Sequence, residues 1–283
     1  MNKDLSNESI DLADEDVALK ILDVFNEKFS INLKDLHSFL FRRRLALAFK
    51  SQNISMNEFI FDNNVLSHEN ADRMLYTFFP DHSELFRDIE TWLILRDKVL
   101  KILCKKKIVH VFFPFAITGE EIYSLLILLK EFYPENNYKL KVNSRSSWAL
   151  HRISNGYLVK PKNRLSLANF KLLCDKSEMS VYLEKVKNTY CFKRELLNNV
   201  NFEKYNNEDF IDTEMYDLII CRNKTLSYKH EKAIKIITKT IDQVNENGVV
   251  IFGINENIPN SLMSGFQTIS WSEKIFQRKA HEK

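Results

Sequence analysis

The segment 216–223, which reads Y-D-L-I-I-C-R-N, constrains the fold more than any other part of the chain. Its apolar run 218–220 stops abruptly at Cys221-Arg222-Asn223. A buried parallel strand has this appearance where its carboxyl end emerges into a functional crevice. The pattern therefore predicts an open α/β sheet whose strand ends carry the functional side chains.

A second apolar run, 108–113, precedes the acidic pair Glu120-Glu121, and a helical pattern follows directly. The carboxyl ends of parallel strands share one edge of a sheet. We therefore expect Glu120 and Glu121 to lie near Arg222 and Asn223, in a crevice of the kind that binds nucleotide-like ligands.

The composition narrows the class of protein. The chain has 283 residues and a formal net charge of +3, a balance that disfavours a dedicated nucleic-acid binder. The four cysteines form no CxxC pair, so neither a zinc site nor a redox motif is indicated. With only five glycines, the chain lacks the G-x-G-x-x-G signature of dinucleotide binding. The acidic amino terminus is not a signal peptide, and no membrane span is evident, so we expect a soluble cytoplasmic protein. We also expect a monomer.

The hydrophobic period divides the chain into a disordered tail (1–15), a small helical domain (16–76) and an α/β domain (77–283). Within the last, helical and strand patterns alternate, which predicts a doubly wound sheet. The predicted strands are 108–113, 138–143, 199–203, 216–221 and 248–253, with strand character again at 268–276. The predicted helices are 119–132, 146–154 and 229–245, preceded by one that begins at Pro80 and runs through Leu100. The region 160–197 is predicted to be an insertion with a short helix and a hairpin of 180–182 and 189–192.

The ordered motifs resemble the CheR family, the S-adenosylmethionine-dependent methyltransferases that esterify glutamates on bacterial chemotaxis receptors. The matching segments are Phe78-Phe79 (F-F-R in the family), 118–125 (T-G-E-E-P-Y-S), Gly156-Tyr157, 200–206 (V-x-F-x-x-x-N), 216–223 (F-D-x-I-x-C-R-N), Asn247-Gly248, and Gly253 with Glu256 (G-x-S-E). The resemblance implies a methyltransferase-like doubly wound sheet after a small all-helical domain, with a β-hairpin insertion.

The resemblance also implies a cofactor and a partner. The cofactor is S-adenosylmethionine, and the partner is a protein substrate or receptor tail that carries glutamates. The implied cofactor-binding residues are Thr118, Glu120, Glu121, Ser144, Asn206, Arg222 and Asn223, and the implied catalytic residues are Arg96 and Tyr228. Glu120 or Glu121 would bind the amino group of the cofactor.

Several positions depart from the family pattern. Pro80 replaces an arginine, and Asn143-Ser144 stand where an acid would hold the ribose hydroxyls. The loop 113–117 is bulky, and Tyr228 is shifted by one position. We therefore expect weak cofactor binding at best. Two functions remain open: a glutamate O-methyltransferase, or a catalytically impaired binding module that recognises a receptor or signalling partner.

Simpler interpretations stand beside these assignments. Glu120 and Glu121 could be first-turn acids favoured by the helix dipole, and Asn223 could only cap a turn. Arg96 could be a surface residue. The run Arg42-Arg43-Arg44 could be a solvated face or a surface for an acidic partner.

The predicted hairpin has a functional interpretation of its own. In the family that the chain resembles, a hairpin at this place docks receptor tails by strand addition, a mode that needs an exposed strand edge. The segment contains no glycine, so its turn is expected at Lys187-Asn188. We expect the hairpin to bind a partner even if methyl transfer is lost.

Overall fold

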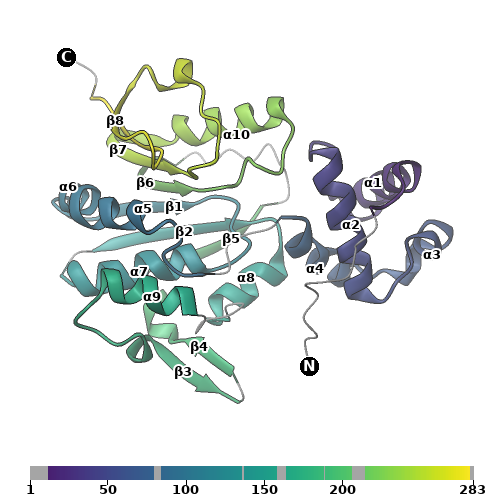
Figure 1. The fold of residues 1–283 in the computed structure, drawn as a ribbon, viewed down its shortest axis with the longest axis horizontal. Coiled ribbons are helices and arrows are strands. Elements are labelled where there is room, and N and C mark those ends of the chain that lie inside the picture. The colour runs from purple at the N-terminus through teal and green to yellow at the C-terminus, as the bar shows by residue number, and fades with distance from the viewer. Residues whose placement is uncertain are drawn as a thin grey trace. The chain divides into compact units, whose positions relative to one another are not determined.

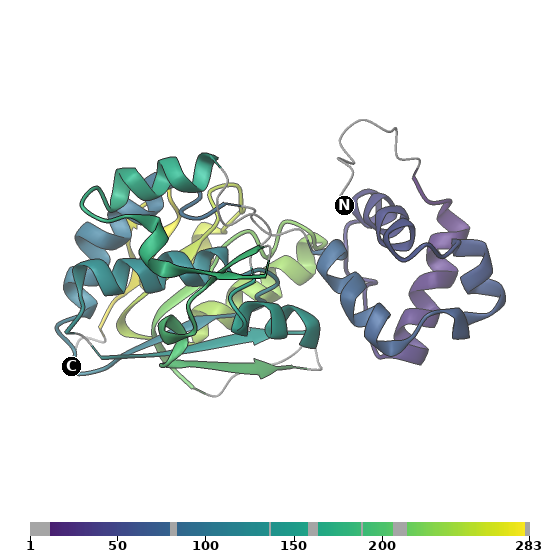
Figure 2. The same cartoon turned by 90° about the horizontal axis from the view of Figure 1, so that it is seen from below.

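The computed structural model describes residues 12–79, 84–135, 137–157, 164–187, 189–205 and 214–280. The chain divides into two units (Figures 1 and 2). The helical unit comprises Met1–Pro80 and Ser227–Lys232, and the α/β unit comprises Asp81–Leu226 and Ala233–Lys283. No helix within the described ranges is both long and apolar enough to cross a membrane.

An aromatic core holds the helical unit together. Its elements are α1 (Glu15–Phe29), α2 (Ser38–Gln52), α3 (Met56–Phe61), a 3-10 turn (Asn63–Val65) and α4 (His68–Phe78). Phe25, Phe49, Phe59 and Phe78 come from these four helices and are at most 2% exposed. The ring of Phe25 packs 5.8–6.4 Å from those of the other three, in the tilted and edge-to-face geometries that aromatic rings prefer.

The first described residues belong to this core. The Asp14 carboxylate accepts hydrogen bonds from the backbone N–H groups of Asp16 and Val17, which is an N-cap for α1. Ala13 is buried, and its carbonyl accepts a hydrogen bond of 2.6 Å from Arg42 Nε. The prediction of a disordered tail is therefore wrong for residues 12–15, while residues 1–11 lie outside the described ranges.

The three arginines of α2 have different environments. Arg42 is tied to the backbone of Ala13, so it is a structural residue. Arg43 is exposed. Arg44 is partly buried, and burial, followed by the charge of Arg43, lowers the pKa of its guanidinium. A surface for an acidic partner on α2 thus stays a prediction for Arg43 and Arg44.

A short segment from the second half of the chain completes the helical unit. The backbone N–H of His37 donates to the carbonyl of Ser227, and that of Lys229 donates to the carbonyl of Asp35, each at 2.8 Å. Between these two bonds, Tyr228 packs its ring 5.7 Å from that of Phe79. The residues that follow the C-R-N motif are therefore anchored in the helical unit.

The α/β unit is built on a seven-stranded sheet of order β5-β2-β1-β6-β7-β9-β8. The strands are β5 (Val200–Lys204), β2 (Tyr138–Ser144), β1 (Val109–Phe113), β6 (Tyr216–Cys221), β7 (Val244–Phe252), β9 (Ile275–Arg278) and β8 (Phe266–Ser270). The first five run parallel, and β9 pairs antiparallel with β7 and β8. Because the strand order reverses between β1 and β6, the switch point of this doubly wound sheet lies there. The predicted fold class is confirmed.

Helices cover both faces of the sheet. They are α7 (Glu120–Phe132), α8 (Ser147–Ser154), α9 (Arg164–Leu173), α10 (His230–Asp242), and the series α5 (Ile89–Ile94), a π turn (Leu95–Val99) and α6 (Leu100–Leu103). All six residues of β6 are buried, as expected of a central parallel strand. Leu218 and Ile220 join the core beneath α7, and Ile219 and Cys221 join the core beneath α10.

Two predicted boundaries are wrong. β7 begins at Val244, because Tyr216 pairs with Val244 and Leu218 with Val249. Asn247-Gly248 is therefore an irregularity inside the strand, with Asn247 at φ 62°, whereas the predicted ranges 229–245 and 248–253 start the strand only at Gly248. The helix expected from Pro80, a residue outside the described ranges, begins at Ile89 after a loop over 84–88.

The insertion contains the predicted hairpin, formed by β3 (Leu183–Val186) and β4 (Thr189–Phe192). The strand predicted at 180–182 is wrong, since these residues lie in a 3-10 turn (Met179–Tyr182). Lys187 occupies the turn with φ 53°, as the sequence suggested, and Asn188 lies outside the described residues. The ring of Phe192 stacks 4.3 Å from that of Tyr123, and this contact fixes the hairpin to helix α7.

Candidate functional site

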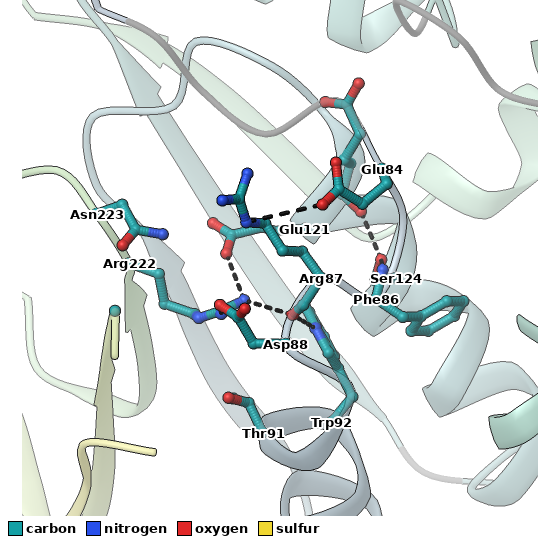
Figure 3. A network of polar contacts seen from close by, with 12 residues as sticks. Glu84, Phe86, Arg87, Asp88, Thr91, Trp92, Glu121, Ser124, Arg222 and Asn223 are labelled. Atoms are coloured by element: carbon teal, nitrogen blue, oxygen red, sulfur yellow. Dashed lines mark hydrogen bonds and ion pairs between the residues drawn. The ribbon is translucent and has the colours of Figure 1, made fainter. Parts of the chain in front are cut away.

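Arg222 lies just beyond the carboxyl end of β6 and is fully buried. Its Nη1 atom donates to Oε1 of Glu121 at 2.9 Å and to the backbone carbonyl of Arg87 at 3.2 Å, and its Nη2 donates to the Asp88 carboxylate (Figure 3). The guanidinium carbon also lies 6.0 Å from the ring centroid of Trp92. Two carboxylates thus share one buried guanidinium, so loss of the arginine would remove a cation that both of them bind.

The loop 84–88 is the second component of this cluster. Phe86 and Asp88 have φ values of 54° and 57°, in the left-handed region that non-glycine residues rarely adopt. The backbone N–H of Phe86 donates to Ser124 Oγ on α7 at 2.9 Å, and Arg222 binds Asp88 (Figure 3). These contacts hold the loop in a conformation that is unfavourable by itself. Sequence reasoning missed Asp88, although an acid directly before a helical pattern is a recognisable signal.

Asn223 follows Arg222 and also has a positive φ, 57°. Its side chain lies against Gly253 at the end of β7. A Cβ atom at Gly253 would stand 2.1 Å from Asn223 Oδ1, so only glycine fits there. The ends of β6 and β7 are thus interlocked through Asn223 and Gly253.

The acidic pair forms the first turn of α7. Glu120 is 1% exposed and Glu121 is 7% exposed. Acids that only complement a helix dipole are usually solvated, because burial of a carboxylate is costly. The burial of both residues therefore favours a role inside the crevice, and the Arg222 contact gives Glu121 one such role. Thr118, one turn earlier in the chain, is partly exposed.

The end of β2 carries a buried amide. Asn143 is 1% exposed, and neither its Oδ1 nor its Nδ2 has a hydrogen-bond partner among the described residues. Ser144 is also buried, but its Oγ accepts a hydrogen bond of 3.2 Å from the backbone N–H of Ser146. An orphaned buried amide costs about 1–3 kcal/mol, so it is retained where a ligand or water meets it. Of the two residues, Asn143 is the one whose side chain is available for a ligand.

The bulky side chains of the loop 113–117 fill the predicted cofactor site less than their size suggests. Phe113 is buried in the core beneath α7. Phe115 adopts a left-handed φ of 58°, and its ring meets that of Tyr205 at 5.6 Å. The backbone N–H of Ala116 donates to the Asn143 carbonyl at 2.7 Å. The loop is therefore fixed to the ends of β2 and β5.

Arg96, one of the two residues expected to catalyse the reaction, is not brought to this cluster. Arg96 donates to the Leu173 carbonyl at 3.0 Å and lies 5.1 Å from the ring centroid of Phe132, the last residue of α7. Glu120 begins that helix, about 18 Å away at 1.5 Å per residue. Tyr228 belongs to the helical unit, and Asn206 lies outside the described residues.

Cys221 has no sign of a nucleophilic role. Burial raises the pKa of its thiol well above the usual value, so the thiol stays protonated at neutral pH. Within the described residues, no three His, Cys, Asp or Glu side chains are arranged to hold a metal ion.

Comparison with known protein families shows the family to which this chain belongs. The sequence model of the family described as CheR methyltransferase, SAM binding domain, matches residues 81–275, which is well over half of the chain. The chain belongs to the CheR methyltransferase family. Among curated CheR relatives, the chemotaxis protein methyltransferase of Borreliella burgdorferi is 23% identical over 275 residues, covering 91% of this chain and 93% of that protein. The one from Listeria innocua is 24% identical over 237 residues, covering 81% and 85%.

The residues of this CheR-family site fit S-adenosylmethionine. That cofactor presents an ammonium group and ribose hydroxyls, which call for carboxylates and for hydrogen-bonding amides. The crevice offers buried carboxylates at the start of α7 and the orphaned amide of Asn143 at the end of β2. A SAM-binding domain with this set of side chains can hold the cofactor.

Proposed function

We propose that this chain transfers the methyl group of S-adenosylmethionine to glutamate side chains of a chemotaxis-type receptor in the cytoplasm. The observation that carries the proposal is the CheR family match over residues 81–275, almost the whole α/β unit. The relative from Borreliella burgdorferi, similar over nearly its full length, is a chemotaxis protein methyltransferase.

The chemistry asks little of the protein. When bound, S-adenosylmethionine supplies a methyl group on a positively charged sulfur. A glutamate is already ionised near neutral pH, so it can attack without a general base. The task of the chain is to bind the cofactor, exclude water and align the acceptor. In this proposal Glu120 or Glu121 binds the ammonium group, and Asn143 binds a ribose hydroxyl. Thr118, Ser144, Asn206, Arg222 and Asn223 shape the remaining wall.

In this proposal the main role of Arg222 is to hold neighbouring residues in place, and direct contact with the cofactor is secondary. Its guanidinium is fully buried and already binds Glu121, Asp88 and the Arg87 carbonyl. Because the carboxylate of Glu121 already binds Arg222, we assign the ammonium group to Glu120. Arg96 and Tyr228 are left without an assigned role in catalysis.

A second candidate function is a binding module that keeps the fold and recognises a receptor without methylating it. The engagement of Glu121 by Arg222 favours it, because this contact competes with the ammonium group of the cofactor. The missing ribose acid at Ser144 supports it as well.

One experiment separates the two functions. S-adenosylhomocysteine binding is measured by isothermal titration, and methyl transfer from labelled S-adenosylmethionine to a receptor cytoplasmic domain is followed as base-labile ester. The enzyme proposal expects both binding and label, and the label disappears when the receptor glutamates are replaced by glutamine. Receptor binding without label would establish the binding module.

A further inference from the structure

Glu256 carries a buried carboxylate that joins two loops at the crevice edge. It is 2% exposed and lies in the loop after β7. Its Oε2 accepts hydrogen bonds from the backbone N–H groups of Asn223 at 2.8 Å and Gly253 at 2.6 Å. Its Oε1 accepts from the backbone N–H and the Oγ1 of Thr225, at 2.8 and 2.6 Å. Four donors from the ends of two strands thus converge on one side chain.

These bonds fix the backbone beyond Arg222. Asn223 has a left-handed φ of 57°, and its side chain fills the space that a Cβ at Gly253 would need. The Glu256 carboxylate binds the amides of both residues, so it holds them in the one arrangement in which they fit. Arg222, immediately before Asn223, then has its guanidinium in reach of Glu121.

We propose that Glu256 is a positioning residue for the cofactor crevice. It sets the backbone of 222–225 and, through that backbone, the positions of the Arg222 and Asn223 side chains. The inference rests on the proposed function only in assigning those two side chains to the cofactor site. Glu256 itself need not touch the cofactor.

The carboxylate is chemically necessary for this role. A glutamine of the same shape has one acceptor oxygen, which can serve one of the two donor pairs. Its amide nitrogen would face the other side, where it cannot accept from a backbone N–H and can only donate to the Thr225 hydroxyl. Glu256→Gln should therefore release the backbone N–H groups either of Asn223 and Gly253 or of Thr225, without leaving a cavity.

Asp217 offers a matched control. It is also a buried carboxylate on the β6 side of the sheet, and it accepts hydrogen bonds from the His110 N–H and Asn245 Nδ2, each at 2.9 Å, and from Lys106 Nζ. It lies near the start of β6, at the opposite end of the strand from Arg222. Asp217→Asn removes comparable bonds far from the crevice.

The test uses the full chain and two measurements. S-adenosylhomocysteine affinity is measured by titration, and hydrogen exchange is measured for the amides of Asn223, Thr225 and Gly253. We expect Glu256→Gln to weaken binding roughly tenfold and to deprotect either the amides of Asn223 and Gly253 or that of Thr225. We expect Asp217→Asn to keep affinity within about twofold and to leave these amides protected, although both variants lower the melting temperature.

A milder variant guards against misfolding. Thr225→Val removes only the Oγ1 hydrogen bond and should give an intermediate loss of affinity. Equal weakening by Asp217→Asn and Glu256→Gln, or unchanged affinity in Glu256→Gln and Thr225→Val, would overturn the proposal. A wild-type chain that binds no S-adenosylhomocysteine would instead refute the proposed function, and the exchange pattern would still decide whether Glu256 orders the loop.

Discussion

The Nη1 atom of Arg222 lies 2.9 Å from Oε1 of Glu121, across a sequence separation of 101 positions. This contact ties the end of β6 to the first turn of α7, and the contact with Asp88 adds the loop before α5. One side chain thereby connects three segments that are far apart in the sequence.

Arg222→Met should destabilise the α/β unit by about 3 kcal/mol, because it removes the buried cation that Glu121 and Asp88 share. Denaturant unfolding measures this loss. Lys130→Met is the control, since Lys130 on α7 forms an exposed ion pair with Glu195 at 3.3 Å. It should change stability by less than about 1 kcal/mol. Equal effects of the two variants would contradict a structural role for Arg222.

Asn143→Leu should separate stability from binding. Removal of an orphaned buried amide should raise the free energy of unfolding by about 1–3 kcal/mol. The same change should weaken S-adenosylhomocysteine binding at least about fivefold if Asn143 meets the ribose. Asn201→Leu, at an exposed position of β5, is the control and should leave affinity unchanged. A destabilised Asn143→Leu protein with unchanged affinity would mean that the amide serves the fold.

Ser144→Asp tests the neighbouring position. If residue 144 faces the ribose, a carboxylate there should tighten binding, because charged hydrogen bonds contribute about 1.5–3 kcal/mol against about 0.5–1.5 for neutral ones. The Ser144 hydroxyl already accepts a local bond from Ser146, so we expect a smaller change than at Asn143. Titration with S-adenosylhomocysteine measures the affinity of both variants and of the wild-type chain. A wild-type affinity tighter than micromolar, about −8 kcal/mol, would show that the missing acid matters little.

Asp217 should make stability depend on pH in the acid range. Burial by itself raises the pKa of Asp217, but hydrogen bonds from His110, Lys106 and Asn245 outweigh it and hold the pKa below 3.8. The folded state therefore binds this proton less tightly than the unfolded chain. The resulting stability is present above about pH 4 and is lost as the pH falls through the folded pKa. Between about pH 6 and about pH 3, the free energy of unfolding in urea should depend less steeply on pH in Asp217→Asn than in the wild type. An equally steep dependence in both proteins would contradict this role of Asp217.

The hairpin needs point changes and not a deletion. Removing 178–193 would take away Phe192 and Tyr182, which are buried against α7 and its neighbours. In a hairpin with a two-residue turn, Lys185 and Tyr190 form the pair whose backbone groups point outward. Lys185→Pro and Tyr190→Pro should each remove one outward donor, and so reduce capture of a glutamate-containing receptor tail. Lys185→Ala and Tyr190→Ala keep that donor and serve as controls. Full capture by both proline variants, measured by pull-down, would rule out strand addition.

The sequence alone determined the class of fold and most of the sheet. The strand at Tyr216–Cys221 was predictable to the residue, because its central apolar run 218–220 is typical of a strand buried on both faces and ends abruptly. The motif order also pointed to the family that the comparison later showed. Boundaries marked by single turn residues were less secure. Asn247-Gly248 has the same local signal whether it connects elements or kinks a strand, and only the pairing of Val244 with Tyr216 decides.

The tertiary structure alone decided which polar residues meet. Glu121 and Arg222 carry no sequence signal of their contact, because residues far apart along the chain are brought together by the order of the strands. Arg96 lies beside the far end of α7, and its place there depends on how the helices pack, which the sequence around Arg96 does not show. Asn143 and Ser144 are alike in sequence terms, and only the local hydrogen bond from Ser146 leaves one of them available. Local periodicity reports burial, whereas contacts between strand ends depend on topology, which short-range patterns do not encode.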